Sequence, residues 1–204
     1  MTDTLTIDVV IPSRNEADTI TGVVSAFTLN PWIGNIIVVC NQCDDGTQEA
    51  ATRAGALVLE QNAVAGKGQT LKVGLDYVET KRVMFCDADL QGPVADYVTD
   101  LAGPGYKGMV IGVTDFPVLS PVPWRVPRSV FAKVAGQRSL PTEIARSVEL
   151  HGYTVEVMLN RAVEQAGLPY QFMQMKGVKG KVRNNGRRMA ELRRDQQWLR
   201  ENWK

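Results

Sequence analysis

The chain has 204 residues, of which 44% are hydrophobic and 22% charged. This length suits one well-buried α/β domain and is short for two, the composition has no bias toward disorder, and the net charge of +1 by itself points to no class of partner. No apolar run reaches the length of a membrane span and the first residues lack signal-peptide features, so we expect a cytoplasmic protein, with peripheral membrane contact left open.

The first half of the chain alternates short apolar runs with helical patterns. Strands are predicted over 7–11, 36–40 and 57–60, and helices over about 19–27, from about 47 to 54, and from 66–68 to about 78. Strand–helix units of about thirty residues imply right-handed crossovers. We therefore predict an α/β fold with a mostly parallel sheet flanked by helices, in which ligands bind beyond the carboxyl ends of the strands.

A central buried strand is predicted within Arg82–Gln91, and it stops at two carboxylates, Asp87 and Asp89. Side chains two residues apart on an extended segment point the same way, so these two can converge on one hard cation, which would bridge them to a diphosphate. The alternative is a pair of acidic turn residues that caps the next helix.

Three other polar clusters follow predicted strands and should meet the carboxylates at the same edge: Ser13–Glu16, Asn41–Asp45 and Gly66–Gly68. The glycines around Lys67 would let backbone N–H groups approach a phosphate while the ammonium supplies charge, although a surface lysine in a loop has the same appearance. Arg14 is a phosphate ligand or a solvated side chain. Glu16 accepts bonds from a ribose or favours its helix N-terminus.

The three cysteines are Cys40, Cys43 and Cys86, an odd count that argues against a disulfide framework. Cys40 and Cys43 form a C-x-x-C. A zinc or redox role would need further partners, and His151 is the only histidine in the sequence. We therefore expect buried cysteines at strand ends.

The pattern changes after Gln91. We predict a helix over about 94–101, a strand over 109–113, and helices over about 142–150 and 155–166, with Glu156 in the first turn of the last one. Between them, 116–128 holds four prolines and reads as a wrapping loop, whose Trp124, Arg125 and Arg128 either clamp an anionic acceptor or pack on the domain. From Lys176 to Arg194, eight Lys or Arg residues accompany one acid, which indicates a solvated basic helix or an anionic partner.

The order of these motifs resembles a known family. The segments IPSRNEADTI, DDGT, GKGQTLKVGL, DADLQ, GQRSL and GYTVEVMLN are similar to those of family 2 glycosyltransferases with the GT-A fold, including dolichyl-phosphate mannose synthase and glucosyl-3-phosphoglycerate synthase-like enzymes. The resemblance implies a transferase domain over 1–175, with a nucleotide-sugar half (about 1–92) and an acceptor half (about 93–175), followed by a basic segment and helix over 176–204. It also implies a UDP- or GDP-sugar donor and Mg²⁺ or Mn²⁺.

The resemblance also implies roles for single residues. Asp87 and Asp89 would hold the metal, Asp89 more directly and with a catalytic role, and Glu156 would face the sugar or acceptor as a candidate base. Gly136, Gln137 and Arg138 would contact the acceptor or the donor phosphates. The nucleotide-sugar pocket would be lined by Pro12, Ser13, Arg14, Glu16, Asn41, Lys67, Asp87 and Ala88.

The chain departs from the family pattern in two places. The aspartate that usually reads the base falls at Cys40 or Asn41, which leaves the nucleotide open. The family often has a metal-binding histidine in a segment like Gly177–Gly180, and this chain has none there. The metal would then have only aspartate, phosphate and water ligands, or Lys179 and Lys181 would neutralise the diphosphate instead.

The acceptor is open as well. A small phosphorylated molecule or a polyprenyl phosphate is expected, and the alternative is a base in nucleic acid, with the basic C-terminal segment on the phosphates; the same charges would suit anionic lipid. A different class, a sugar nucleotidyltransferase or a non-catalytic nucleotide binder, is a further alternative. Nucleotidyltransferases usually have a glycine-rich loop after the first strand, whereas this chain has Pro12–Glu16. Inverting or retaining chemistry and the oligomeric state stay open.

Overall fold

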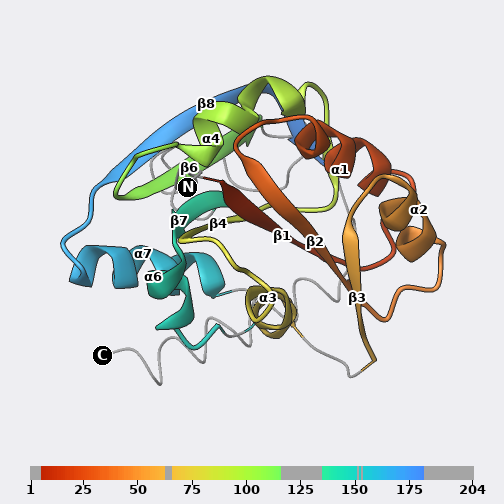
Figure 1. The fold of residues 1–204 in the computed structure, drawn as a ribbon, viewed down its shortest axis with the longest axis horizontal. Helices are drawn as coiled ribbons and strands as arrows, with labels where there is room; N and C mark the ends of the chain where they lie inside the picture. Colours follow the sequence, from red (N-terminus) through yellow and green to blue (C-terminus); the bar gives the residue numbers. More distant parts are fainter. Residues whose placement is uncertain (1–5, 63–65, 116–134, 151, 153, 182–204) are drawn as a thin grey trace, which may run out of the picture.

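The structure, a computed structural model, describes residues 6–62, 66–115, 135–150, 152 and 154–181. Within these ranges one eight-stranded sheet, in the order β3-β2-β1-β4-β7-β6-β8-β5, is covered by helices on both faces (Figure 1). None of the helices in these ranges has the length and apolarity that crossing a membrane requires. The predicted loop over 116–128, His151 and the tail beyond Lys181 lie outside the described residues.

The first half folds as predicted, because each apolar run becomes a strand; β1, β2 and β4 are largely buried, and β3 is a partly exposed edge strand. Its strands pair in parallel, β2 with β1 and β3, and β4 with β1. The elements are β1 (Ile7–Ser13), α1 (Ile20–Thr28), β2 (Ile33–Asn41), α2 (Thr47–Arg53), β3 (Leu57–Gln61), α3 (Lys67–Leu75) and β4 (Arg82–Phe85).

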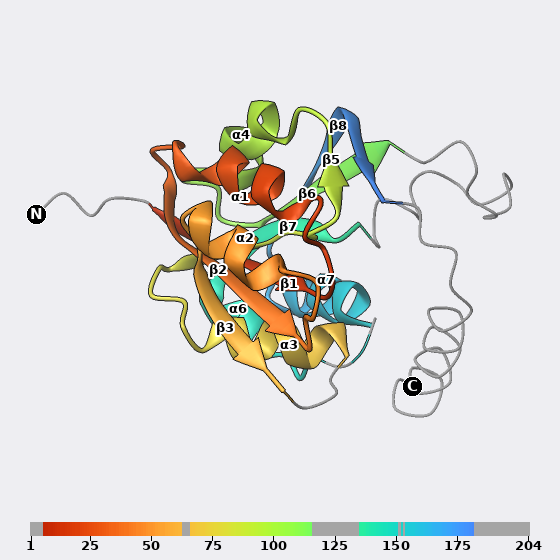
Figure 2. The ribbon, with the colours of Figure 1, turned by 90° about the vertical axis from the view of Figure 1, so that its right-hand side faces the viewer.

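The second half makes the sheet mixed. Its elements are β5 (Leu90–Gln91), the 3₁₀ helix η1 (Val94–Tyr97), α4 (Val98–Ala102), β6 (Met109–Asp115), β7 (Gln137–Pro141), α6 (Thr142–Arg146), α7 (Val155–Gln165) and β8 (Tyr170–Gly180). β7 is antiparallel to β4 and β6, and β5 to β8, while β6 and β8 are parallel. Figure 2 shows β5 and β8 together at one edge.

Three expectations need correction or extension. β7 was not predicted, and the sequence indicated only a segment that precedes a helix. Gln137, Arg138 and Ser139 are polar yet buried, so a search for hydrophobic runs does not find this strand. The helix expected over 142–150 ends at Arg146, whose guanidinium donates to the carbonyls of Leu75, the last residue of α3, and of Val78 in the segment that follows. β8 runs past residue 175, so the described sheet continues to Gly180.

The core has two layers, one on each face of the sheet. On β1, Val9 and Ile11 belong to the cluster that packs under α1, α2 and α4, and Val10 to the cluster that packs on α3, α6 and α7. From Val9 onward β1 and β2 pair without a register shift, with Ser13 opposite Cys40, and β4 joins with Val10 opposite Phe85. The chain therefore leaves β1, β2 and β4 at the same edge of the sheet, which brings the predicted polar clusters together.

Candidate active site

The loops that follow β1 and β2 are tied to each other by polar contacts. The Glu16 N–H donates to Thr47 Oγ1 at 2.8 Å, and one Asp45 carboxylate accepts from the N–H groups of Ala17 and Thr47, both at 3.0 Å. Burial would raise the pKa of Asp45, but these hydrogen bonds and the Thr47 hydroxyl outweigh it and hold the pKa below its usual value. The DDGT segment therefore fixes the loop predicted to face the nucleotide.

The floor of this edge is polar although it is buried. Ser13, Glu16 and Asn41 are 3%, 6% and 6% exposed. Within the described residues, no hydrogen-bond partner lies within reach of the Ser13 hydroxyl. A buried hydroxyl normally has a partner, so the fold leaves a donor and acceptor here that a polar ligand can use. Arg14 and Pro12 flank this floor and are partly exposed.

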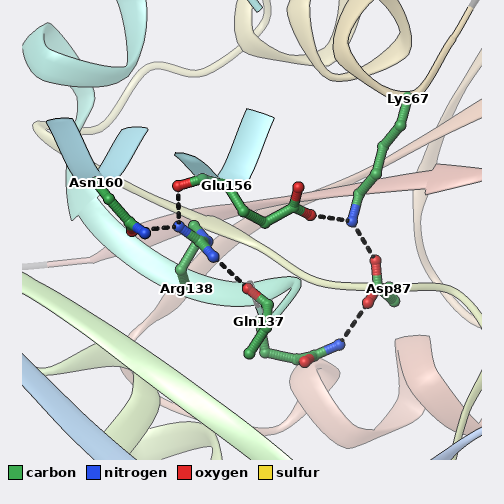
Figure 3. Close-up of polar contacts among 7 residues, drawn as sticks. Lys67, Asp87, Gln137, Arg138, Glu156 and Asn160 are labelled. Carbon is green, nitrogen blue, oxygen red and sulfur yellow. Dashed lines mark hydrogen bonds and ion pairs between the residues drawn. The ribbon is translucent and has the colours of Figure 1, made fainter. Parts of the chain in front are cut away.

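Lys67, the first residue of α3, joins two carboxylates from opposite halves of the chain (Figure 3). Its Nζ lies 2.8 Å from Asp87 Oδ1 and 2.8 Å from Glu156 Oε1, with side-chain exposures of 16%, 32% and 10%. Burial would lower the pKa of Lys67, but the charges of Asp87 and Glu156 outweigh it and raise the pKa above the ordinary value. The ammonium therefore stays charged throughout the physiological range.

Gln137 and Arg138 extend this network from β7. Gln137 Nε2 donates to Asp87 Oδ2 at 2.8 Å. Arg138, 1% exposed, donates to the Glu156 carbonyl at 3.0 Å, to Asn160 Oδ1 at 2.9 Å and to the Ala135 carbonyl. Burial lowers the pKa of Arg138, and the charges of Glu156 and Asp87 oppose this effect. Its guanidinium therefore holds the first turn of α7, and a role in direct contact with an acceptor stays a prediction.

Glycines allow close approach around both aspartates. A Cβ on Gly136 would lie 2.2 Å from Asp87 Oδ2, so only glycine fits there without moving the carboxylate. A Cβ on Gly180 would lie 3.7 Å from Asp89 Oδ1, which places the end of β8 beside Asp89. The Lys181 N–H donates to the Asp89 carbonyl at 3.1 Å. Gly177–Gly180, where the family often has a metal-binding histidine, thus ends beside Asp89.

The side chain of Lys181 reaches across to the loop after β1. Its Nζ lies 2.5 Å from Asp18 Oδ2, and this hydrogen bond lowers the pKa of Asp18. Both groups are solvent-exposed, with side-chain exposures of 35% and 65%. Lys181 thus contacts Asp89 through its backbone N–H and Asp18 through its ammonium.

Asp87 and Asp89 could hold a divalent metal if a bound ligand and water complete its coordination. In the described ranges, no group of three or more His, Cys, Asp or Glu side chains is arranged to hold a metal. Asp87 and Asp89 supply hard carboxylate oxygens two residues apart, and both Asp87 oxygens also accept hydrogen bonds, from Lys67 and Gln137. Such a donor set suits Mg²⁺ or Mn²⁺ with a diphosphate and water as the remaining ligands.

The glycine pair around Lys67 is used differently from the prediction. The Gly68 N–H donates to the Gly152 carbonyl at 3.0 Å, and a Cβ on Gly66 would lie 3.2 Å from Gly152 Cα. These glycines therefore join α3 to the segment before α7. The ammonium of Lys67, not the Gly68 N–H, is directed at the site.

Two residues of the site were missed from the sequence. Thr19 Oγ1 donates to the Ala88 carbonyl at 2.9 Å and so ties α1 to the turn between the aspartates. Asn160 accepts from Arg138. Its signal is the spacing of four residues from Glu156, which places both on one face of α7.

The family follows from comparison with known proteins. A model of the family described as glycosyl transferase family 2 matches residues 8–165. The chain belongs to glycosyltransferase family 2. Glycosyltransferase AglJ of Haloferax volcanii is 34% identical over 82 residues, 40% of this chain and 26% of that protein. Glucosyl-3-phosphoglycerate synthase of Mycolicibacterium smegmatis is 33% identical over 110 residues, 48% of this chain and 36% of that protein.

The alignments thus span only 26% and 36% of the length of these two curated relatives. Among solved structures, glucosyl-3-phosphoglycerate synthase from Mycobacterium tuberculosis with Mn²⁺, uridine diphosphate and glucosyl-3-phosphoglycerate is 24% identical, with a TM-score of 0.78, and the match covers 92% of this chain and 76% of that chain. A crystal structure of a mycobacterial protein is 26% identical, with a TM-score of 0.75, over 88% and 68%. The predicted GT-A fold is confirmed.

Proposed function

We propose that this family 2 chain is a metal-dependent glycosyltransferase that moves a sugar from a nucleotide-diphosphate sugar to an anionic acceptor. The observation that carries this proposal is the contact of Lys67 with Asp87 and Glu156, both at 2.8 Å, just beyond the carboxyl end of β4 and two residues before Asp89. The buried Ser13 hydroxyl ends the neighbouring strand β1. Hard oxygen donors, a fixed cation and a partnerless buried hydroxyl are what a sugar diphosphate needs.

We propose UDP as the nucleotide and Mn²⁺ or Mg²⁺ as the metal. Support comes from the mycobacterial synthase, whose structures contain Mn²⁺ or Mg²⁺ together with uridine diphosphate. In this chain Asp87 and Asp89 would hold the metal, and Ser13, Asn41 and the loop of Arg14 and Glu16 would form the nucleotide pocket. When bound, the metal would supply Lewis-acid stabilisation of the departing nucleoside diphosphate.

The residues of the chain would divide the remaining work. The Lys67 ammonium would also contact the diphosphate and stabilise the negative charge that develops there during transfer. Glu156 would accept a hydrogen bond or proton from the acceptor hydroxyl. Arg138 would keep Glu156 in position through the backbone of α7, and Gln137 would orient Asp87.

We propose that the Lys181 ammonium neutralises the diphosphate, because the segment before it lacks the metal-binding histidine that the family often has there. Lys181 follows Gly180 directly, its N–H donates to the Asp89 carbonyl, and its ammonium pairs with Asp18 in the loop after β1. A diphosphate could draw the ammonium from the exposed Asp18, because an exposed ion pair is weak. Replacing Lys181 with Ala should weaken UDP binding while leaving its metal dependence in place.

The acceptor is proposed to be a small phosphorylated molecule in the cytosol. The mycobacterial synthase was crystallised with phosphoglyceric acid, which supports an acceptor of this kind. No observation in the described part of the chain favours nucleic acid or lipid, and most of the basic segment lies outside it. Membership of a glycosyltransferase family counts against a nucleotidyltransferase.

Sugar transfer from UDP-glucose with Mn²⁺ tests the proposal. The acceptors to compare are 3-phosphoglycerate, a polyprenyl phosphate and duplex DNA, and we expect transfer to the first. Asp89→Ala should reduce transfer to background; activity near the parent level would remove the metal role. Donor binding without transfer to any acceptor or to water would instead indicate a non-catalytic binder.

Glu156→Gln separates two roles for that carboxylate. If Glu156 is the base, the rate should fall roughly 100-fold or more while UDP binding persists. A rate close to that of the parent protein would reduce Glu156 to a structural partner of Lys67. The stereochemistry of the product, read by nuclear magnetic resonance, then distinguishes inversion from retention.

A further inference from the structure

β2 ends in two cysteines that the proposed mechanism does not use. Cys40, 1% exposed, lies within β2, and Cys43 follows in the loop, partly buried against the core cluster that contains Cys40. Both are free thiols. The Cys43 thiol lies 3.7 Å from the Ser13 carbonyl as a weak donor, and Cys40 is the β2 residue that pairs with Ser13. The pair therefore touches the strand end that carries the buried Ser13 hydroxyl.

The backbone between the cysteines explains why the thiols meet. Gln42 has a φ of 54°, a left-handed conformation that reverses the chain after β2. Its N–H donates to the Gln61 carbonyl at 3.1 Å and its amide to the Asn62 carbonyl at 3.2 Å. The turn is thus anchored on β3 and returns the chain from Cys40 toward Ser13, where Cys43 makes its contact.

We propose that Cys40 and Cys43 form a reversible disulfide that weakens nucleotide binding, an inference that rests on the proposed nucleotide pocket. In the forward reaction the Cys43 thiolate attacks a low-molecular-weight disulfide, such as oxidised glutathione, and expels one glutathione thiolate. The Cys40 sulfur, losing its proton to solvent, then attacks Cys43 and expels the second. The protein dithiol loses two electrons and two protons, and the small disulfide becomes two thiols.

The two thiols differ in accessibility and acidity in the way that these two steps require. The hydrogen bond from Cys40 lowers the pKa of the Cys43 thiol, which is also the more accessible of the pair. The same hydrogen bond, together with burial, raises the pKa of Cys40, so Cys40 acts second, when Cys43 is already a mixed disulfide. Cys86 is 1% exposed and burial raises the pKa of its thiol, which makes it an unreactive internal reference.

Oxidation would reach the nucleotide through two contacts. The Cys43 thiol loses its hydrogen and therefore its contact with the Ser13 carbonyl. The new bond also closes a ring that includes Asn41, which is buried at the same edge. Both changes move groups that we place in the pocket, so the oxidised form should bind UDP roughly fivefold or more weakly.

The experiment treats the full chain with mixtures of reduced and oxidised glutathione, alkylates the remaining thiols, and reads intact mass and UDP affinity with Mn²⁺. We expect a loss of two hydrogens at Cys40 and Cys43, an unchanged Cys86, weaker UDP binding, and recovery after reduction with dithiothreitol. Cys43→Ser and Cys40→Ser should each bind UDP equally well before and after the oxidant, because neither can close the ring.

Two results would overturn the inference. One is a stable glutathione adduct, or unmodified thiols, where the disulfide is expected. The other is a formed disulfide with unchanged UDP affinity. If the reduced protein fails to bind UDP at all, the proposed function falls and its redox control falls with it, while the mass measurement still decides whether the disulfide forms.

Discussion

At the scale of single residues, Lys67 is the contact on which the site depends. It neutralises Asp87, at the end of β4, and Glu156, at the start of α7, both at 2.8 Å. Without it the two carboxylates would lose the cation that they share. The same ammonium that stabilises the fold is therefore held at the proposed diphosphate site.

Replacing Lys67 with Met should cost about 2 kcal/mol of unfolding free energy, less than a fully buried pair because Asp87 is 32% exposed. Urea denaturation measures this. Lys72→Met, on the exposed face of the same helix, is the matched control and should change stability by less than about 0.5 kcal/mol. Adding Glu156→Gln to Lys67→Met should recover part of the loss; strictly additive costs would contradict the ion-pair account.

At the scale of elements, the parallel half of the sheet positions the polar loops, and α3 is the helix that must lie close to it. Gly74 makes this approach possible, since a Cβ there would lie 2.4 Å from Val10 Cγ1 and 3.0 Å from Val39 Cγ2. Those two valines belong to β1 and β2. The position of Lys67 at the start of α3 thus depends on a small residue near its end.

Gly74→Ala should destabilise the protein by about 1–3 kcal/mol, because the methyl group forces the helix away from the sheet. Gly22→Ala in α1 is the control: nothing lies within 4 Å of its added Cβ, so the change should stabilise by up to about 1 kcal/mol. Thermal unfolding of both variants checks the pair. Equal effects of the same sign would contradict the packing argument.

The elements also show how far the sequence predicts the fold. Ile7 to Phe85 was predictable because each strand there contains a short apolar run followed by polar residues. β7 was not, because Arg138 is buried by bonds to Glu156 and Asn160, and Ser139 by one to the Leu101 carbonyl at 2.5 Å. β8 was not, because many of its residues are exposed.

The same reasoning applies to the site. Asp87 and Asp89 could be placed at the sheet edge from the sequence, because every parallel strand ends on that side. The contact of Lys67 with Glu156 joins residues 89 positions apart, and no local pattern encodes it. Roles for Gly136, Gln137 and Arg138 toward an acceptor stay predictions.

At the scale of the whole molecule, Arg82 fastens the two halves together. Its guanidinium donates to the carbonyls of Ala102, Tyr106 and Gly108 at 3.1, 2.9 and 2.8 Å, and to the Ser139 carbonyl and hydroxyl at 2.9 Å. Burial lowers the pKa of Arg82 to about 10, which still leaves it charged at neutral pH. The Arg82 guanidinium thus joins β4 to α4, to β7 and to the segment before β6.

Arg82→Lys should destabilise the protein by about 2–4 kcal/mol, since a single ammonium cannot span these acceptors. Arg53→Lys, at an exposed position, should be near neutral. Urea unfolding should remain one cooperative transition with a lower midpoint. Two separate transitions would mean that the halves fold independently, against the single sheet seen here.

The most direct test of the account is the thermal shift that UDP produces with Mn²⁺ or with a chelator. UDP with Mn²⁺ should raise the melting temperature of the parent protein, because a ligand at a hundredfold excess over its Kd stabilises the folded state by about 2.7 kcal/mol. Asp100→Asn, at an exposed position of α4, is the control and should show the same rise. The chelator, or Asp89→Asn, should remove most of this shift. A UDP shift that survives both, or no shift with any metal, would contradict a metal-assisted diphosphate site at this edge of the sheet.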